Sequence, residues 1–206
     1  MDYRDQMVLT GEINDVGAPI MTNVPRSYRA GIEMEAGLHP LNRLHWDVNL
    51  TLSRNRIKGF TEYVDNWDYW NDPDNQPYQY SKDLGERDLS YSPSVIAGSR
   101  ITYEIFKDLK VILQSRYVGK QYIDNTSSED RIIDNYFVND LTIHYNFNTK
   151  LVEEIGLSLQ VNNLFNVEYE TNAWIYRYYQ GGEEYYTDGY FPQAGIHLFG
   201  GVTLKF

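Results

Sequence analysis

The sequence of 206 residues contains no cysteine. It can therefore form no disulfide, no thiolate nucleophile and no thiolate metal site. It also lacks any run approaching the ~20 consecutive apolar residues of a transmembrane helix, so a membrane span would have to be built from strands. The first residues, 1–5, have no apolar segment of the kind found in signal peptides. We expect such a start in a mature form or a fragment of an exported protein.

Basic residues are few, because 18 Lys and Arg face 29 Asp and Glu and leave a formal net charge of −11. This charge argues against a nucleic-acid partner, whose phosphates would be repelled. Only 42% of the residues are hydrophobic and the mean hydropathy is −0.55, yet aromatics reach 15% and include 19 tyrosines. Low apolarity combined with many amphipathic rings suits a surface that meets both lipid and water.

Residues 43–53 alternate strictly between apolar and polar side chains. The apolar set is Leu44, Trp46, Val48, Leu50 and Leu52, and the polar set is His45, Asp47, Asn49 and Thr51. Residues 28–36 alternate in the same way, and the short link 37–40 separates the two runs. The pattern predicts a β-hairpin with one apolar face and a tight turn.

The same two-residue period returns along the chain, which predicts an all-β, antiparallel, up-and-down arrangement of about eight strands. Besides the two strands above, the alternating runs are 3–10, 95–105, 111–117, 141–147, 155–161 and 196–206. Most of these runs approach the ~9–11 residues that a tilted strand needs to cross a bilayer.

Short and long connections alternate between the predicted strands. Links 37–42, 107–110 and 148–152 are tight, whereas the long polar links are 11–25, 55–93, 121–134 and 165–194. Long loops on one side and short turns on the other are typical of a transmembrane barrel, with the C-terminus on the short-turn side. The alternative, a soluble antiparallel sandwich or barrel with one buried face, explains the alternation but not the strand length or the one-sided loops.

Three C-terminal motifs carry a resemblance to a known family. Residues 159–169, LQVNNLFNVEY, resemble the V-x-NLF-x-x-x-Y segment near the end of TonB-dependent outer-membrane receptors. Residues 190–195, YFPQAG, resemble the closing signature of these receptors, with Ile196 where an Arg is common. The ending resembles the barrel-assembly signal, here Gly201, Leu204 and Phe206, while 7–14 and 22–24 look like the middle of receptors from Bacteroidetes-type bacteria.

This resemblance implies a location and a function. Family receptors are plugged 22-stranded barrels in the outer membrane, so residues 1–206 would be the C-terminal portion of such a barrel, without plug domain or energy-coupling box. The receptor would import a scarce nutrient, most often a ferric siderophore or another metal chelate, by TonB-dependent transport. Implied partners are outer-membrane lipid and lipopolysaccharide, the barrel-assembly machinery, a small-molecule ligand, and TonB through the missing plug.

A self-contained small outer-membrane barrel, acting as an adhesin or envelope-interaction protein, is the alternative function. A complete barrel must pair residues 3–10 with 196–206, whereas a fragment of a larger barrel leaves both edges open.

Aromatic residues crowd the two longest polar links and are the candidate ligand contacts. Rings with a polar tip can hold an amphipathic ligand by stacking and hydrogen bonding. The candidates are Trp67, Tyr69, Trp70, Tyr78, Tyr80, Trp174, Tyr176, Arg177, Tyr178, Tyr179, Tyr185 and Tyr186. The alternative is that several belong to an interface belt or pack the loops against themselves.

The sequence predicts neither a metal site nor a cofactor. The acidic set Asp65, Asp68, Asp72, Asp74 and Asn75 offers oxygen ligands but lacks the glycine and distal glutamate of an EF-hand, which favours a solvated acidic loop. The histidines, His39, His45, His144 and His197, lack zinc-ligand spacing and suit a polar barrel lumen.

We also predict that the chain is not an enzyme and assign no catalytic residue. No G-x-S-x-G or comparable nucleophile signature is present. An enzyme would require Asp, His and Ser or Glu from separate strands to converge at the extracellular end. The pairs Glu33 with Glu35 and Glu153 with Glu154 are interpreted as structural, with the first pair expected to form salt bridges to lumenal arginines.

Overall fold

The computed structural model describes residues 1–206, and thirteen strands make up nearly all of its regular structure. The strands are β1 (Asp2–Ile13), β2 (Pro19–Leu41), β3 (Leu44–Asn66), β4 (Gln79–Asp88), β5 (Val95–Phe106), β6 (Leu109–Val118), β7 (Gln121–Tyr122), β8 (Ile132–Ile133), β9 (Tyr136–Phe147), β10 (Glu154–Asn162), β11 (Glu170–Gln180), β12 (Glu183–Pro192) and β13 (His197–Lys205). A single 3-10 turn, η1, covers Trp67–Trp70. None of the structure's helical segments has the length and apolarity of a transmembrane span.

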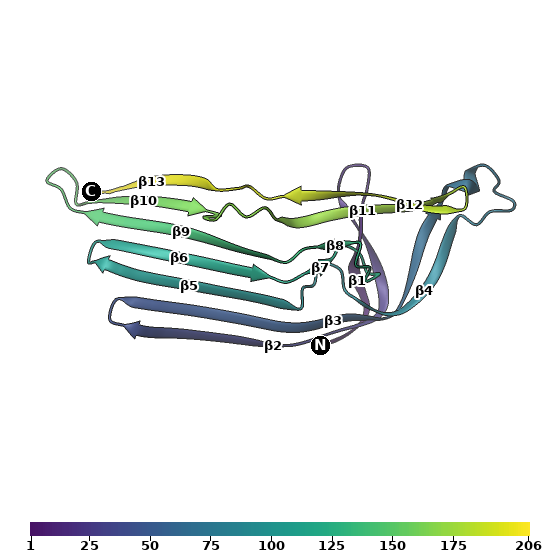
Figure 1. Ribbon diagram of the computed structural model, residues 1–206, viewed down its shortest axis with the longest axis horizontal. Helices are drawn as coiled ribbons and strands as arrows, with labels where there is room; N and C mark the ends of the chain where they lie inside the picture. The colour runs from purple at the N-terminus through teal and green to yellow at the C-terminus, as the bar shows by residue number, and fades with distance from the viewer.

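One antiparallel sheet with the order β1-β2-β3-β5-β6-β9-β10-β13 forms the body of the molecule. The strands stand in this sheet in the same order as along the chain, and β4, β7, β8, β11 and β12 belong to the connections between them. This is the up-and-down arrangement predicted from the sequence. Short turns and the C-terminus gather at one end, the short-turn end, and the remaining connections project from the other, the hairpin end (Figure 1). The predicted fold class is thus confirmed.

The register of the sheet brings the apolar side chains of successive strands into continuous rows. Residues paired across antiparallel strands point to the same face, so the pairing list identifies each face. One apolar row is Leu38, Trp46, Ile101, Leu113, Leu141, Val161 and Leu198. The adjacent polar row on the other face is Gly37, Asp47, Arg100, Gln114 and Asp140. The strands that these rows cross therefore share one apolar and one polar face.

The apolar face stays uncovered, which excludes the soluble sandwich. Trp46 is 36% exposed, Leu157 is 40% exposed and Ile32 is 62% exposed, and no second sheet packs on them. A soluble protein would bury such a continuous apolar surface because leaving it in water costs about 25 cal/mol per Å². The face has the composition and the strand length of a surface in contact with lipid.

The sheet does not close into a barrel. β1 and β13 stand at opposite ends of the strand order and do not pair. β1 pairs only with Pro19–Tyr28, so one edge of β2 has no partner from Ala30 to Leu41. Both open edges carry free backbone donors and acceptors, which in a membrane must be satisfied by further strands. A self-contained closed barrel is therefore contradicted by the strand order.

Several predicted boundaries are wrong. The first tight turn lies at Asn42–Arg43, and the predicted link 37–40 belongs to β2. The long link 55–93 is mostly the outer halves of β3 and β4, and 165–194 is mostly the hairpin of β11 and β12. These hairpins extend beyond the lipid-facing part of the sheet, where no bilayer imposes apolar alternation along a whole strand and only short stretches, such as Ala173 and Ile175 of β11, are buried. The sequence pattern that reveals strands is therefore absent there.

The buried residues gather toward the hairpin end, on the outer parts of the sheet strands and on the segments that pack against them. One cluster consists of Val8, Val24, Ile57 and Leu89, and a second of Ile123, Ile133, Ala173 and Ile175. Tyr91 packs against the second cluster and donates its hydroxyl to the carbonyl of Ala173; burial raises the pKa of this phenol to about 12. The outer hairpins are thus held by a small hydrophobic core of their own.

Of the two glutamate pairs, Glu33 with Glu35 forms no salt bridge, whereas Glu153 of the second pair forms one. Neither Glu33 nor Glu35 has an arginine or lysine nitrogen within 4.0 Å, so the prediction of bridges to lumenal arginines is wrong. Glu35 lies opposite Asn49 in the register, and no arginine is paired with it in the sheet. At the short-turn end Glu153 pairs with Lys205 at 2.8 Å, which is a structural contact of the kind expected there.

Candidate ligand-binding site

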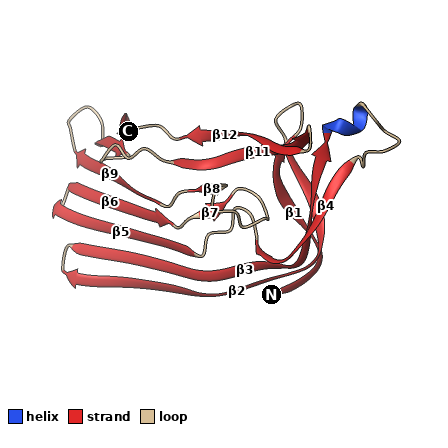
Figure 2. Cartoon of the chain, turned by 45° about the vertical axis from the view of Figure 1, so that its right-hand side comes forward, coloured by secondary structure: helices blue, strands red, loops and turns tan.

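Three hairpins meet at the hairpin end of the sheet. They are formed by β1 with the first part of β2, by the second part of β3 with β4, and by β11 with β12. β11 contacts both β1 and β3 and runs parallel to β3 at the pairs Tyr178–Asp65 and Tyr179–Asn66. As Figure 2 shows, the β3–β4 hairpin bends away from the sheet and reaches across to the β11–β12 hairpin. Segments more than 100 residues apart in the sequence thus form one surface.

A polar contact fixes the tips of two of these hairpins to each other. The carboxylate of Asp68 in η1 accepts hydrogen bonds from the backbone N–H groups of Gly181 at 2.9 Å and Gly182 at 3.2 Å. Both glycines form the β11–β12 turn with positive φ of 64° and 78°, a conformation that glycine adopts without strain. This turn points its two donors at one acceptor.

Arg177 on β11 connects the hairpins near their centre. Its guanidinium contacts the carboxylate of Glu62 on β3 and that of Glu184 on β12, with Nε donating to Glu184 at 2.7 Å. The side chains of Arg177 and Glu62 are each only 11% exposed. The pair is therefore largely removed from water, where an arginine without its carboxylate would be costly.

Two cavities flank the Arg177–Glu62 pair, and both residues line each of them. The larger, of 710 Å³, lies between the β3–β4 hairpin, the β11–β12 hairpin and the loop 126–131. Its lining combines three cations, three carboxylates and three tyrosines, which are Lys82, Arg131, Arg177, Glu62, Asp130, Glu184, Tyr80, Tyr179 and Tyr186. We call it the tyrosine cleft.

The smaller cavity, of 440 Å³, lies between the β1–β2 and β3–β4 hairpins and is acidic. Its carboxylates are Glu12, Glu62, Asp65 and Asp124, and Arg177 is its single basic side chain. Burial raises the pKa of Glu12, the charge of Asp65 raises it further, and Arg177 opposes the shift. The carboxylates of this cavity therefore outnumber its cations. In the tyrosine cleft the two kinds of charge are balanced, and of its three cations only Lys82 has no ion pair.

The sequence of this chain matches a known protein family. The family model described as "TonB dependent receptor-like, beta-barrel" matches residues 1–164. The chain belongs to the TonB-dependent receptor family. Receptors of this family are outer-membrane proteins, so the apolar face meets lipid and the hairpin end is extracellular.

Solved structures support the same fold. The siderophore receptor PiuA from Acinetobacter baumannii matches with a TM-score of 0.63 and 17% identity over 98% of this chain and 24% of that one. The copper transporter OprC gives 0.60 and 19% identity over 100% and 27%, and the ferric yersiniabactin uptake receptor FyuA from Yersinia pestis gives 0.58 and 19% over 97% and 25%. The chain thus spans about a quarter of the length of these receptors. Curated proteins gave no significant match.

Several aromatic residues singled out from the receptor sequence pack between the extracellular hairpins. Trp67 stacks on Tyr178 with ring centroids 3.9 Å apart, and its Nε1 donates to the hydroxyl of Tyr176 at 3.1 Å. Tyr176 in turn donates to Asp65 at 3.0 Å, and Tyr185 stacks with Tyr178 at a centroid distance of 5.8 Å. These four rings hold the receptor's β3–β4 and β11–β12 hairpins together.

Other predicted aromatics lie away from this contact. Tyr69, Trp70 and Tyr78 pack edge to face at the tip of the β3–β4 hairpin, and Trp70 stays 70% exposed. Trp174 lies against Gly189 of its own hairpin, where an added Cβ would meet the indole nitrogen at 2.4 Å. None of these four lines the tyrosine cleft of the receptor.

Four predicted residues do line the tyrosine cleft: Tyr80, Arg177, Tyr179 and Tyr186. Tyr80 and Tyr179 approach each other edge to face at 4.8 Å across the two hairpins. Sequence reasoning missed Lys82 and Arg131, the other cations of the receptor's cleft. No local motif marks them, because one lies on β4 and the other on the β7–β8 connection.

The acidic segment of the β3–β4 hairpin is used in separate hydrogen bonds. Asp65 accepts from Tyr176 and Gln79, Asp68 from the glycine turn, and Asp72 from Asn75. No group of three or more His, Asp or Glu side chains gathers in metal-binding geometry. All four histidines lie outside the three extracellular hairpins, with His45 beside Asp47 and His39 near the short-turn end of the receptor sheet.

Proposed function

We propose that residues 1–206 are the C-terminal portion of the barrel of an outer-membrane receptor that imports a scarce nutrient by TonB-dependent transport, most often a ferric siderophore or another metal chelate. Family membership supports the transport mechanism. Proteins with a similar fold include a siderophore receptor, a ferric yersiniabactin uptake receptor and a copper transporter. In this proposal the plug of the full-length receptor connects it to TonB, and the open edges of the sheet pair with the rest of the barrel.

The observation that carries the proposal for this chain is the tyrosine cleft. It opens on the extracellular side, its volume of 710 Å³ is that of a small-molecule site, and it presents cations beside rings with polar tips. Lys82 has no carboxylate within 4.0 Å, so its charge is free for a ligand. Metal chelates often carry net negative charge and flat, conjugated groups, which these side chains contact well.

We further propose that the chain contributes no catalytic group. The family consists of receptors and transporters. An enzyme of the alternative kind needs a histidine among the extracellular hairpins, and these hairpins contain none.

The terminal residues Gly201, Leu204 and Phe206 make no contact with the extracellular core, and Phe206 is 88% exposed. Their proposed role is recognition by the barrel-assembly machinery before insertion.

The test is binding and uptake by the full receptor that contains this chain. Purified receptor is titrated with ferric catecholates, ferric hydroxamates, a copper chelate and cobalamin, and uptake is measured in cells lacking other receptors for the same ligand. Replacing Lys82 with Ala is expected to weaken binding of the preferred anionic chelate about tenfold, the value of one hydrogen bond to a charged group. Lys150→Ala at the short-turn end is the matched control. Equal affinity of both variants would exclude the tyrosine cleft as the binding site, and uptake without TonB would exclude the transport mechanism.

A further inference from the structure

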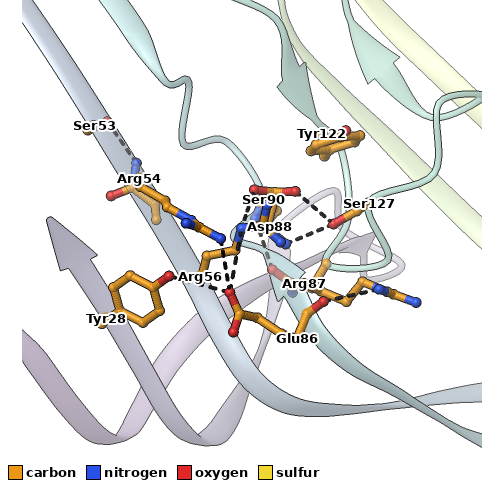
Figure 3. A network of polar contacts seen from close by, with 12 residues as sticks. Tyr28, Ser53, Arg54, Arg56, Glu86, Arg87, Asp88, Ser90, Tyr122 and Ser127 are labelled. Atoms are coloured by element: carbon orange, nitrogen blue, oxygen red, sulfur yellow. Dashed lines mark hydrogen bonds and ion pairs between the residues drawn. The ribbon is translucent and has the colours of Figure 1, made fainter. Parts of the chain in front are cut away.

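Charged side chains at the hairpin end form ion pairs with one another. Arg56, for example, pairs with Asp88 at 3.0 Å inside the polar network of Figure 3. A different group lies on the lumenal face at the short-turn end, where His39, His45 and Asp47 meet across the β2–β3 turn. No lysine or arginine nitrogen lies within 4.0 Å of Asp47. The group is therefore not an ordinary ion pair, and we call His39 and His45 the histidine pair.

The two imidazole rings of the histidine pair lie against each other. Nδ1 of His45 is 3.2 Å from Nε2 and 3.4 Å from Nδ1 of His39, and the ring centroids are 4.4 Å apart. Two imidazole nitrogens bound to one tetrahedral metal ion at roughly 2.0–2.1 Å lie about 3.3 Å from each other. His39 is exposed, so its ring is free to turn a lone pair toward the shared position. The separation of the two residues is thus that of two ligands of one ion.

Asp47 determines which nitrogen of His45 is available. Its Oδ1 lies 2.7 Å from Nε2 of His45, on the side of the ring that faces away from His39. A carboxylate in this place keeps the proton on Nε2 and leaves the lone pair of Nδ1 for a ligand. Arg100 is opposite Asp47 in the register of β3 and β5 but forms no ion pair with it. The carboxylate is therefore free to orient His45 as carboxylates orient metal-binding histidines.

An irregularity of the β2–β3 hairpin brings the histidine pair together. The register of the two strands shifts between Leu38 and Leu41, just before the tight turn, and His39 lies inside this stretch. Such irregularities re-aim side chains, and here His39 meets the ring of His45. The spacing of histidines along the chain does not reveal this contact. For that reason the sequence predicted no metal site.

The surroundings of Asp47 are open and negatively charged. A cavity of 420 Å³ lies beside it, with Glu35, Gly37 and Asn49 among the lining residues. A Cβ on Gly37 would come within 3.4 Å of Asp47 Oδ1 and 3.8 Å of Cε1 of His45, so the glycine leaves room for both side chains. Glu35 adds a second carboxylate to this part of the lumenal wall. These features favour a small cation over an anion.

We propose that His39 and His45 bind one first-row transition-metal dication, with Asp47 as a positioning residue. Imidazole nitrogen suits Cu²⁺, Zn²⁺ and Ni²⁺, and Cu²⁺ binds most tightly among these to a given nitrogen site. Hard cations such as Mg²⁺ prefer oxygen ligands and are not expected to bind. The site lies at the short-turn end, whereas the tyrosine cleft lies among the extracellular hairpins, so the inference does not rest on the imported ligand.

The test is metal binding by the full receptor, purified without a polyhistidine tag and freed of metal with a chelator. Cu²⁺, Zn²⁺ and Mg²⁺ are titrated by calorimetry, and electron paramagnetic resonance of the Cu²⁺ complex detects coupling to bound imidazole nitrogens. We expect H39Q/H45Q to bind one Cu²⁺ ion fewer than wild type, and D47N to bind that ion about 10–100-fold more weakly while keeping the nitrogen coupling at saturation. H144Q removes an exposed lumenal histidine of β9 and, as the matched control, should bind like wild type.

Each result either supports or contradicts the proposal. Loss of one Cu²⁺ ion in H39Q/H45Q, together with loss of its two-nitrogen coupling, supports it. An equal number of bound ions in this variant and in wild type overturns it, since the histidine pair would then share only a proton. Equal Cu²⁺ affinity of D47N and wild type overturns the positioning role of Asp47. If the double variant fails to fold, H39Q alone removes one exposed ligand and should weaken Cu²⁺ binding at least as much as D47N.

Discussion

Arg177 determines how the extracellular hairpins sit relative to one another. It contacts Glu62 on one hairpin and Glu184 on its own, and it lines both cavities between them. A buried ion pair adds little net stability compared with apolar residues of the same size, but breaking it leaves a charge without a partner. Its effect is therefore to select one arrangement of the hairpins over others.

Replacing Arg177 with Met is expected to destabilise the packed hairpins by about 3–5 kcal/mol, because Glu62 keeps its charge in a buried place. Hydrogen exchange of β11 and β12 in the full receptor measures the change. Arg26→Met is the control, since its partner Asp2 is 54% exposed and such pairs contribute about 0–1 kcal/mol. Equal exchange in both variants would show that the Arg177 pair does not hold the hairpins.

Glu12 makes the packing of the β1–β2 hairpin depend on pH. Burial and the nearby Asp65 raise its pKa above the usual 4.5, so the folded state binds a proton more tightly than the unfolded state. The associated stability is complete below pH 4.5 and is lost as pH rises through the raised pKa. Protection factors of β1 amides, corrected for intrinsic exchange, should fall over this window in wild type and stay level in E12Q. A wild-type profile parallel to that of E12Q would contradict the expectation.

At the scale of elements, the β3–β4 and β11–β12 hairpins behave as one unit. A short parallel bridge joins them at Asp65–Tyr178, the Trp67–Tyr178 stack covers it, and Asp68 holds the glycine turn. The tyrosine cleft lies between these hairpins, and its shape therefore follows from their separation. Elements that open around a ligand must break some of these contacts.

Linking the two hairpins covalently is expected to block transport if they separate during uptake. The chain has no cysteine, so the pair Asp65→Cys with Tyr178→Cys gives a single defined disulfide between adjacent positions. Uptake should be lost in the oxidised receptor and regained on reduction, whereas each single variant should be insensitive to oxidation. Undiminished uptake by the crosslinked receptor would show that this bridge stays closed throughout transport.

For the whole molecule, the decisive property is the sidedness of the sheet. Apolar rows face lipid, polar rows face the lumen, and the packed core is displaced to the extracellular hairpins. Stability of the sheet in a membrane comes from satisfied backbone hydrogen bonds and from apolar contact with lipid. A charged side chain should therefore reduce bilayer stability much more at a lipid-facing residue than at the adjacent lumenal residue of the same strand.

Leu159→Arg places a charge on the lipid face of β10 and is expected to cost about 2–4 kcal/mol in bilayer stability. Gln160→Arg places the same charge on the lumenal face one residue away and should cost far less. Unfolding of the full receptor from lipid vesicles by denaturant, followed by the heat-dependent shift in electrophoretic mobility, measures both. Similar losses in the two variants would mean that the assignment of faces is wrong.

The amino-acid sequence by itself determined the sheet and its two faces. Alternation in 43–53 and in 155–161 is a local property with a period of two, and a bilayer enforces it on every strand that crosses. The order of short and long links also placed the C-terminus at the short-turn end, because consecutive links lie at alternate ends of an up-and-down sheet. The aromatic content of the long links identified the segments that form the tyrosine cleft, and four of its lining residues.

Only the tertiary structure decided how the outer hairpins are built and which residues meet between them. Outside the membrane no bilayer enforces a period of two, so β4, β11 and β12 have no alternation along the whole strand that a sequence could reveal. The pairing of Arg177 with Glu62, 115 residues away, and the arrival of Arg131 in the same cleft depend on contacts between distant segments. Such contacts arise from the fold as a whole, because no short-range rule relates one hairpin to another.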